Sequence, residues 1–392
     1  MAKKLEDYKW LCPEPFVNLT TQTTGAMMPC CCSDIWENHE HELKNVETDS
    51  FEEYYNSDLI KKMRQSMKSG NRDFLADICK RCIKQEENGL VSQRQSGLKK
   101  YYNEFKDKRE ELERIIDEEC MPTFIQTPTL ISLGQGQCNL KCGMCDDFTS
   151  SARRRESIEL EEIPKDFPKV RVKHGEKFYK DLDWILENCL EFELPLAEPL
   201  MVKNNYKILK KLDKSKTIKV VTNGTINVDK FIDHVKDFKY TEINVSIEGG
   251  KKVNEYIRYP SKWETIIENF DKLSSLKNSN VTFMSTTNAL NLGKFTQLRK
   301  DIQGRQWHQG GLIGFNDKWT AAAIPDDVKE IYLNDLYEFG NKAMISYVEN
   351  SVYDEKLMIE LMIHCRKRDK LRKAYLPDVF PEWTKYYENC SS

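Results

Sequence analysis

From about residue 127 the chain alternates between strand-like apolar segments and helical segments, and this alternation constrains the fold more than any other feature. Strands and helices that alternate at this spacing are typical of parallel βα units. The expected strands are TLISLGQG, EFELPLAEPL, TIKVVTNGT, EINVSIEGG, NVTFMSTTNAL and, as a sixth, QWHQGGLIGF. Polar and glycine residues gather at their carboxyl ends, where α/β barrels and open parallel sheets both place their sites.

A group of three cysteines follows the first expected strand. Cys138, Cys142 and Cys145 have the spacing C-x3-C-x2-C in QCNLKCGMC. Thiolates bind iron–sulfur clusters, and three of them on one short loop can hold three irons of a cubane. The fourth iron would then have an open position, which suits chemistry better than a structural role. Part of a zinc site is the alternative interpretation, although structural zinc takes four protein ligands.

Charge and hydropathy argue against two broad classes of protein. Lys and Arg number 60 against 63 for Asp and Glu, so nucleic-acid binding is not indicated. No apolar run is long enough to span a bilayer, and MAKKLEDYKW lacks the apolar region of a signal peptide. We therefore expect a cytoplasmic protein without a membrane partner. In that compartment 13 cysteines favour metal or redox sites over disulfides.

The sequence divides into four regions. Residues 1–98 are rich in cysteine, and FVNLTTQTTGAMMPCCC predicts two short strands joined around Thr24-Gly25. Residues 99–126 contain a charged stretch with apolar residues at helical spacing, which predicts a connecting helix. Residues 127–320 hold the βα units, and residues 321–392 are expected to form a helical C-terminal extension.

The cysteine trio and the motifs that follow it resemble radical S-adenosylmethionine (radical SAM) enzymes over roughly residues 127–315. The resemblance implies a partial (β/α)6 barrel and a catalytic 4Fe–4S cluster whose open iron binds S-adenosylmethionine. In that family one electron cleaves the sulfonium, and the 5′-deoxyadenosyl radical takes a hydrogen atom from the substrate. It also implies an electron donor such as flavodoxin or ferredoxin.

Six further residues match cofactor-binding positions of this family. LAEPL stands where the family usually has GGEPL, so Glu198 matches the carboxylate that receives the cofactor's ammonium. Leu196 and Ala197 replace the two glycines that let the backbone approach the cofactor. SIEG resembles the family's SIDG, which implies that Ser246 and Glu248 reach the ribose hydroxyls. The remaining matches are Met144 against the adenine, Arg258 near the cofactor carboxylate and Asn288 at the fifth strand end.

The N-terminal cysteines resemble the twitch module, a shortened relative of SPASM domains. The matching residues are Cys12, Gly25, Cys30, Cys79 and Cys82, and the four cysteines imply an auxiliary 4Fe–4S cluster. The module usually follows the catalytic domain, whereas here it comes first, as in a subgroup of bacterial and phage proteins. A four-cysteine zinc site has the same ligand inventory. Cys31 or Cys32 is an alternative ligand to Cys30.

The resemblance implies a radical SAM oxidoreductase or modifying enzyme, and a peptide or protein side chain is the expected substrate. The alternative within the family is a dehydrogenase or cyclase of a carbohydrate or nucleotide-derived small molecule. An alternative of another class is a non-catalytic zinc or iron–sulfur interaction protein.

Overall fold

The computed structural model describes residues 4–87, 91–134, 136–167, 172–194, 197–312 and 317–390. Its central element is a sheet in the order β2-β1-β3-β4-β5-β6-β7-β8. The first strands are β1 (Thr20–Thr21), β2 (Met27–Met28), β3 (Thr129–Leu130) and β4 (Glu191–Glu193). The longer strands are β5 (Thr217–Thr222), β6 (Tyr240–Ser246), β7 (Ser279–Thr287) and β8 (Trp307–Leu312). Strands β3 to β8 are parallel, in agreement with the expected partial (β/α)6 barrel.

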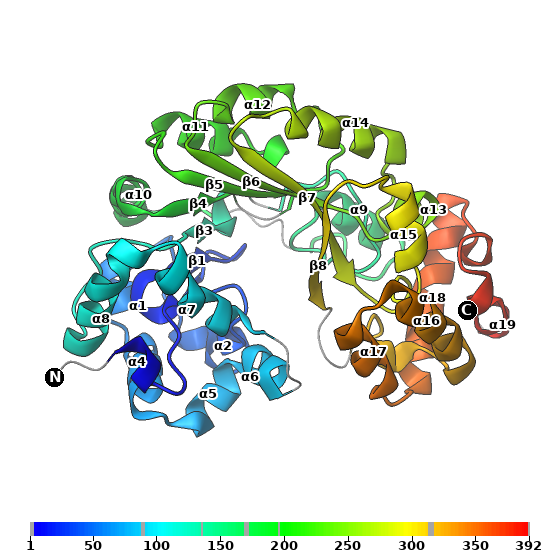
Figure 1. Ribbon diagram of the computed structural model, residues 1–392, viewed down its shortest axis with the longest axis horizontal. Coiled ribbons are helices and arrows are strands. Elements are labelled where there is room, and N and C mark those ends of the chain that lie inside the picture. The colour runs from blue at the N-terminus through cyan, green and yellow to red at the C-terminus, as the bar shows by residue number, and fades with distance from the viewer. Residues whose placement is uncertain are drawn as a thin grey trace.

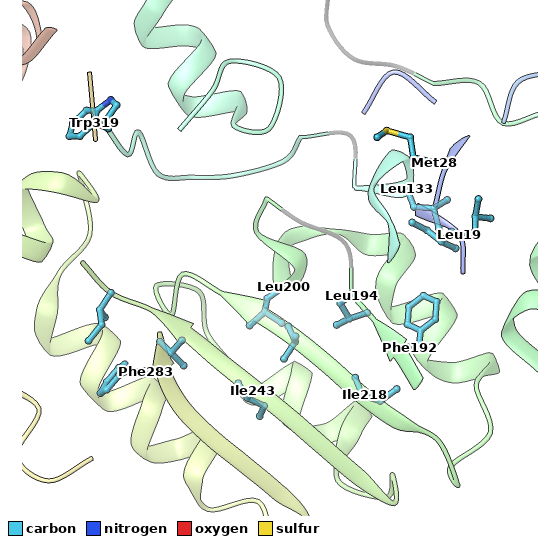
Figure 2. Close-up of a cluster of buried hydrophobic side chains, with 14 of the residues drawn as sticks. Leu19, Met28, Leu133, Phe192, Leu194, Leu200, Ile218, Ile243, Phe283 and Trp319 are labelled. Carbon is cyan, nitrogen blue, oxygen red and sulfur yellow. The ribbon is translucent and has the colours of Figure 1, made fainter. Parts of the chain in front are cut away.

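Helices α11 (Lys203–Lys211), α12 (Asp229–Val235) and α14 (Trp263–Ser274) cover the outer face of the sheet (Figure 1). The other helices of the barrel are α9 (Ser151–Glu159), α10 (Glu176–Asn188), α13 (Lys251–Ile257) and α15 (Phe295–Asp301). Alternate residues of β5 and β6 are buried against this layer, because successive side chains of a strand point to opposite faces. Figure 2 shows Ile218, Ile243 and Phe283 among the buried side chains of successive strands.

The N-terminal module consists of short helices around a hairpin. The helices are α1 (Glu14–Val17), α2 (Ile35–His39), α3 (Phe51–Tyr55), α4 (Asp58–Ser69), α5 (Arg72–Ile78) and α6 (Lys80–Glu87). Strands β1 and β2 pair antiparallel, which confirms the predicted hairpin. Gly25 turns the hairpin with a φ of +86°, and a Cβ atom there would lie 2.6 Å from Asn45 Oδ1. Glycine adopts this left-handed conformation without a steric cost.

The hairpin is also part of the barrel sheet, which the sequence did not indicate. Strand β1 pairs parallel with β3, with Thr20 opposite Thr129 and Thr21 opposite Leu130. Leu19 and Met28 lie in the same buried cluster as Leu133 of the barrel (Figure 2). The N-terminal module is therefore joined to the barrel by both backbone hydrogen bonds and apolar packing.

Two segments differ from the expected elements. The connecting segment holds two helices, α7 (Gln93–Asn103) and α8 (Arg109–Glu118), with a single 3₁₀ turn between them. Strand β3 is only two residues long, because Ile131–Leu133 forms a 3₁₀ turn before the cysteine loop. The C-terminal extension is helical as expected, with α16 (Asp326–Phe339), α17 (Lys342–Glu349), α18 (Glu355–Arg372) and α19 (Thr384–Asn389).

Candidate iron–sulfur and cofactor site

The cysteine loop is held by backbone hydrogen bonds at the carboxyl end of the parallel strands. Lys141 N donates to Tyr259 O at 2.6 Å, and Gly143 N donates to Ile257 O at 2.9 Å. On the other side, Ser150 Oγ donates to Leu140 O at 2.7 Å at the start of α9. These contacts fix the backbone between the three cysteines to α9 and to the end of α13.

Glu198 and the end of β5 form a hydrogen-bonded unit beside the loop. Glu198 is fully buried, and its carboxylate accepts hydrogen bonds from Asn223 N at 2.7 Å, Thr222 Oγ1 at 2.8 Å and Leu200 N at 3.1 Å. Burial raises the pKa of Glu198 to about 6 in spite of these donors. A carboxylate has about four acceptor positions, so one remains for a further donor.

Asn223 connects this unit to the first cysteine. Its Nδ2 donates to Asn139 Oδ1 at 2.9 Å and lies 3.8 Å from Cys138 Sγ. Asn139 Nδ2 in turn donates to Thr225 Oγ1 at 2.9 Å. The TNGT motif at the end of β5 therefore contacts the loop directly, through two asparagines that the residue-level predictions did not include.

Arg258 and Glu248 form a buried ion pair beside the cysteines. Arg258 Nη1 donates to Glu248 Oε1 at 2.9 Å, and Asn291 Nδ2 donates to Glu248 Oε2 at 3.2 Å. Burial raises the pKa of Glu248 to about 7, and the charge of Arg258 opposes that shift. Burial lowers the pKa of Arg258, but its neighbours Cys142, Glu248 and Cys138 give a net upward shift. Within the described residues the buried Nε of Arg258 has no acceptor, so it can serve an anion such as a carboxylate.

Ala197 keeps a backbone conformation that suits the glycine it replaces. Its φ is +83°, in the left-handed region that L-residues with a side chain rarely occupy. Leu196, the other replaced glycine, lies outside the described residues. The backbone path next to Glu198 is therefore compatible with the family pattern at Ala197 even though the glycine is absent.

The other three residues that were expected to contact the cofactor lie in different surroundings. Ser246 ends β6 and is buried, and Met144 is partly buried against the apolar core. Asn288 Oδ1 accepts a hydrogen bond from Leu290 N at 3.0 Å, and Asn288 Nδ2 donates one to Thr286 O at 3.2 Å. The side chain of Asn288 therefore stabilises the turn in which it lies. Asn291, three residues later, is the asparagine that contacts Glu248.

Cys142 is buried, and Cys138 and Cys145 are partly exposed. Burial raises the pKa of Cys142 to about 11 and that of Cys145 to about 12, and it also raises that of Cys138. The charge of Arg258 lowers the pKa of Cys138 and Cys142. A metal ligand must be a thiolate, so a bound cluster and Arg258 would both favour the form that ligates.

The four matched N-terminal cysteines converge on one cavity. Cys12, Cys30, Cys79 and Cys82 all line it, together with Cys32 and a mostly apolar wall that includes Trp10, Met63 and Leu75. Burial raises the pKa of Cys12 and Cys30, and each is raised further by the charges of neighbouring thiols. Cysteines from two parts of the sequence, 12–30 and 79–82, thus place their thiols around one space. This donor set fits a cluster with four thiolate ligands.

The two neighbouring cysteines differ in where they lie. Cys32 lines the cysteine cavity, whereas Cys31 lines a separate polar cavity on the barrel side. Their Sγ atoms are 3.8 Å apart. Hydrogen bonding from Cys31 and the charge of Arg81 lower the pKa of Cys32. Of the two neighbouring cysteines, Cys32 is therefore the one that lies where it could replace Cys30 as a ligand.

Among the described residues, no three Cys, His, Asp or Glu side chains are gathered as the ligands of a single metal ion. A cubane cluster spreads its ligand sulfurs over several irons, so this finding concerns single-ion sites.

The C-terminal extension covers the cysteine loop. Arg372 Nη2, at the end of α18, donates to Lys141 O at 2.6 Å and to Glu156 Oε2 at 2.6 Å. A Cβ atom on Gly143 would lie 2.8 Å from Trp319 Cη2, so the indole packs directly on the loop. His364 of α18 meets Trp319 edge to face, with 5.4 Å between the ring centroids. No pattern in the sequence had assigned this region a role at the site.

A partial parallel barrel with a three-cysteine loop at its strand ends, preceded by a four-cysteine module, agrees with the arrangement expected from the radical SAM resemblance. Residues 133–301 match the Radical SAM superfamily, and residues 12–83 match SPASM, an iron–sulfur cluster-binding domain. The chain is therefore similar to the radical SAM superfamily across most of the barrel, and it carries a SPASM-like segment ahead of the barrel. The two family matches support binding of a 4Fe–4S cluster and of S-adenosylmethionine.

Two of the solved structures that match the chain contain bound S-adenosylmethionine (AdoMet). Streptococcus suis SuiB bound to S-adenosylmethionine is 12% identical, with a TM-score of 0.39 over 86% of this chain and 71% of SuiB. Native anSMEcpe with bound AdoMet is 15% identical, with a TM-score of 0.37 over 58% of this chain. The match spans 64% of anSMEcpe, a little less than two thirds of its length. No curated protein matches the chain. Among the described residues, no helix is long and apolar enough to cross a bilayer.

Proposed function

We propose that the protein is a radical SAM enzyme that uses a 4Fe–4S cluster on Cys138, Cys142 and Cys145 to modify a peptide or protein side chain. When bound, the cluster and S-adenosylmethionine supply a reductive cleavage that yields methionine and a 5′-deoxyadenosyl radical, which takes hydrogen from the substrate. The observation that carries this proposal is the convergence of Glu198, Asn223 and Arg258 on the cysteine loop at the strand ends.

The chain's own residues would bind and orient the cofactor. Glu198 has one acceptor position left for the ammonium group, and the free Nε–H of Arg258 can donate to the carboxylate. Both side chains are held by buried partners, which keeps them in place before the cofactor binds. Trp319 and Arg372 exclude water from the outer side of the loop.

Glu248 is proposed to act mainly through Arg258. Both of its carboxylate oxygens already accept hydrogen bonds, from Arg258 and from Asn291. Its fully buried position leaves it as a positioning residue, which modifies the expectation that it reaches the ribose hydroxyls. Ser246, at the end of β6, keeps that role in the proposal.

The N-terminal cavity is proposed to hold an auxiliary 4Fe–4S cluster on Cys12, Cys30, Cys79 and Cys82. Loss of one electron and one proton from a substrate radical completes a two-electron oxidation, and the auxiliary cluster is the proposed acceptor of that electron. The electron that cleaves the cofactor would come from an external donor such as flavodoxin or ferredoxin. The product would be an oxidised side chain or a new cross-link.

Deuterium transfer tests the proposed substrate class. Reduced protein with S-adenosylmethionine is incubated with uniformly deuterated peptides in one reaction and with deuterated carbohydrates and nucleotides in another. The proposal predicts deuterium in 5′-deoxyadenosine from the peptide fraction. Deuterium from the small-molecule fraction alone would instead support a dehydrogenase or cyclase of small molecules.

A further inference from the structure

A second cavity lies between the N-terminal module and the inner face of the barrel sheet. It has a volume of about 250 Å³. One wall is formed by strand residues that include Glu193, Lys219 and Glu242, and the other by Glu14 and Lys100 of the N-terminal half. Lys219 and Glu242 alternate along their strands with the buried Ile218 and Ile243, so they lie on the opposite, inner face of the sheet.

This cavity is placed between the two proposed clusters. It reaches Val221 and Asn244, which precede the strand-end residues Asn223 and Glu248 by two and four positions. At about 3.3 Å per residue, these offsets correspond to about 7 and 13 Å along the strands. Cys30 lines both this cavity and the cysteine cavity, so the two share a wall.

The two lysines of the cavity are neutralised by other carboxylates. Lys100 Nζ lies 2.8 Å from Glu191 Oε2. Lys219 Nζ lies 3.1 Å from the same oxygen and 3.3 Å from Glu242 Oε2. Two cations thus face two anions in this network, so its net charge is zero, and the lysines act on Glu14 and Glu193 only from beyond ion-pair distance.

Glu14 and Glu193 are carboxylates without a cation of their own. Among the described residues neither forms an ion pair within 4.0 Å. Glu14 Oε2 accepts a hydrogen bond from Asn18, and Glu193 Oε2 accepts one from Thr129 at 2.9 Å. Within the same residues, no donor reaches the second oxygen of either group. Two ionised carboxylates in one enclosed space are unfavourable unless a positive charge joins them or one of them is protonated.

Gln126 gives independent support for a ligand at this place. Its side chain is 2% exposed and lines the cavity, yet its Oε1 has no hydrogen-bond donor among the described residues. A buried acceptor without a donor costs free energy, so such groups usually have a partner. Three acceptors therefore face the same space, and the donors near them already hydrogen-bond to Glu191 or to one oxygen of Glu193.

We propose that this cavity binds a cationic group of the substrate, an ammonium or a guanidinium, between Glu14 and Glu193. Gln126 Oε1 accepts one of its N–H bonds. The cation holds the attached carbon chain on the inner face of the sheet, below the strand ends where the radical forms. The assignment of this cation to the substrate rests on the proposed function, whereas the cation site itself rests on the cavity alone.

Binding of small probes tests the site without any turnover. The probes are N-acetyl-lysine methylamide, N-acetyl-arginine methylamide and the neutral N-acetyl-norleucine methylamide, titrated calorimetrically into the full-length, cluster-loaded protein without reductant. We expect both cationic probes to bind at least about tenfold more tightly than the norleucine probe, as charge-assisted hydrogen bonds are lost without the cation. Equal affinities, or no saturable binding of either cation, would overturn the proposal.

Variants locate the site. Glu193→Gln keeps the size of the side chain and removes its charge, and it should weaken the lysine probe about tenfold. Asp183→Asn removes one charge from an exposed surface position and should leave the affinity unchanged. Unchanged binding in both Glu193→Gln and Glu14→Gln would overturn the proposal. The wild-type probe comparison stands even if a variant misfolds, and iron content checks that Glu14→Gln retains its cluster.

Two further measurements distinguish a peptide from a small-molecule amine, and the cation site from the proposed radical reaction. Tighter binding of N-acetyl-lysine methylamide than of n-butylamine indicates a residue of a peptide, and equal binding indicates a small-molecule amine. Cofactor cleavage is measured separately. If cleavage fails while the cations bind, the proposed function is wrong and the cation site remains; the reverse result removes only the cation site.

Discussion

Arg372, the last residue of α18, donates a hydrogen bond to the backbone carbonyl of Lys141, in the middle of the cysteine loop, over a distance of 2.6 Å. The two residues are 231 positions apart in sequence. The same guanidinium pairs with the fully buried Glu156. The C-terminal extension therefore helps to fix the geometry of the cysteine loop, which lies near the start of the barrel sequence.

Replacement of Arg372 by alanine should loosen the loop. Glu156 keeps Arg153, Arg368 and Lys141 as partners, so we expect a loss of about 1–3 kcal/mol in the free energy of unfolding rather than complete unfolding. Urea denaturation measures this loss. Lys370→Ala, on the same helix and exposed, is the matched control and should change stability by less than about 0.5 kcal/mol. Equal stabilities of the two variants would contradict the role given to Arg372.

The left-handed conformation of Ala197 predicts opposite tolerances for two substitutions. Ala197→Gly should leave stability within about 1 kcal/mol of the wild type, because glycine adopts a φ of +83° freely. Ala197→Val should cost about 1–2 kcal/mol, because a β-branched side chain clashes with the backbone there. Thermal unfolding distinguishes them, and equal tolerance of both substitutions would show that this backbone path is not required.

The N-terminal cysteines should affect the auxiliary cluster alone. Cys79→Ala or Cys82→Ala should lower the iron and sulfide content from that of two clusters to that of one, since both line the cysteine cavity. Cys31→Ser should retain both clusters, because Cys31 lines the other cavity. Metal analysis after anaerobic reconstitution gives the answer. Zinc at this site, with no loss of iron in the Cys79 variant, would favour the structural zinc interpretation.

His174 predicts a pH dependence of stability. Its Nε2 lies 2.9 Å from Ser132 Oγ, which also contacts Thr21 of the hairpin, and burial lowers the pKa of His174. Its folded pKa is thus below the unfolded value of about 6.5, so folding favours the neutral ring. This contribution is complete above the unfolded pKa and is lost as the pH falls through that value towards the lower folded pKa.

Urea midpoints measured at several pH values test this effect. His174→Gln removes the titrating group, so its midpoint should fall less steeply than that of the wild type as the pH is lowered below about 6.5. Identical slopes for the two proteins would show that His174 does not contribute.

The sequence predicted the features that local patterns encode. The alternation of strands and helices, the hairpin at Gly25 and the position of the trio after a strand are all present, because they depend on periodicity and turn chemistry. Long-range pairing was not predictable in the same way. Strand β1 has only two residues, and its pairing with β3 depends on how the N-terminal module packs.

At the site, motif order pointed to segments that the structure also brings together, but it did not specify which of their side chains contact one another. Asn288 was expected at the cofactor, but it caps its own turn, and Asn291 of the same segment contacts Glu248. Asparagine readily hydrogen-bonds to nearby backbone, so its partner is decided by the turn that forms. Asn223 lies at the end of the expected strand TIKVVTNGT, but no periodicity marks its contact with Cys138. Arg372 has no local signal at all, because α18 carries polar and apolar residues around its circumference.

The central claim is that Cys138, Cys142 and Cys145 bind a cluster that cleaves S-adenosylmethionine. The most direct measurement is the formation of 5′-deoxyadenosine by anaerobically reconstituted protein after reduction with S-adenosylmethionine present. We predict product from the wild type and from the Cys79→Ala variant, and none when Cys138, Cys142 and Cys145 are replaced by alanine. Zinc bound at the trio, with no 5′-deoxyadenosine formed by the wild-type protein, would contradict the claim.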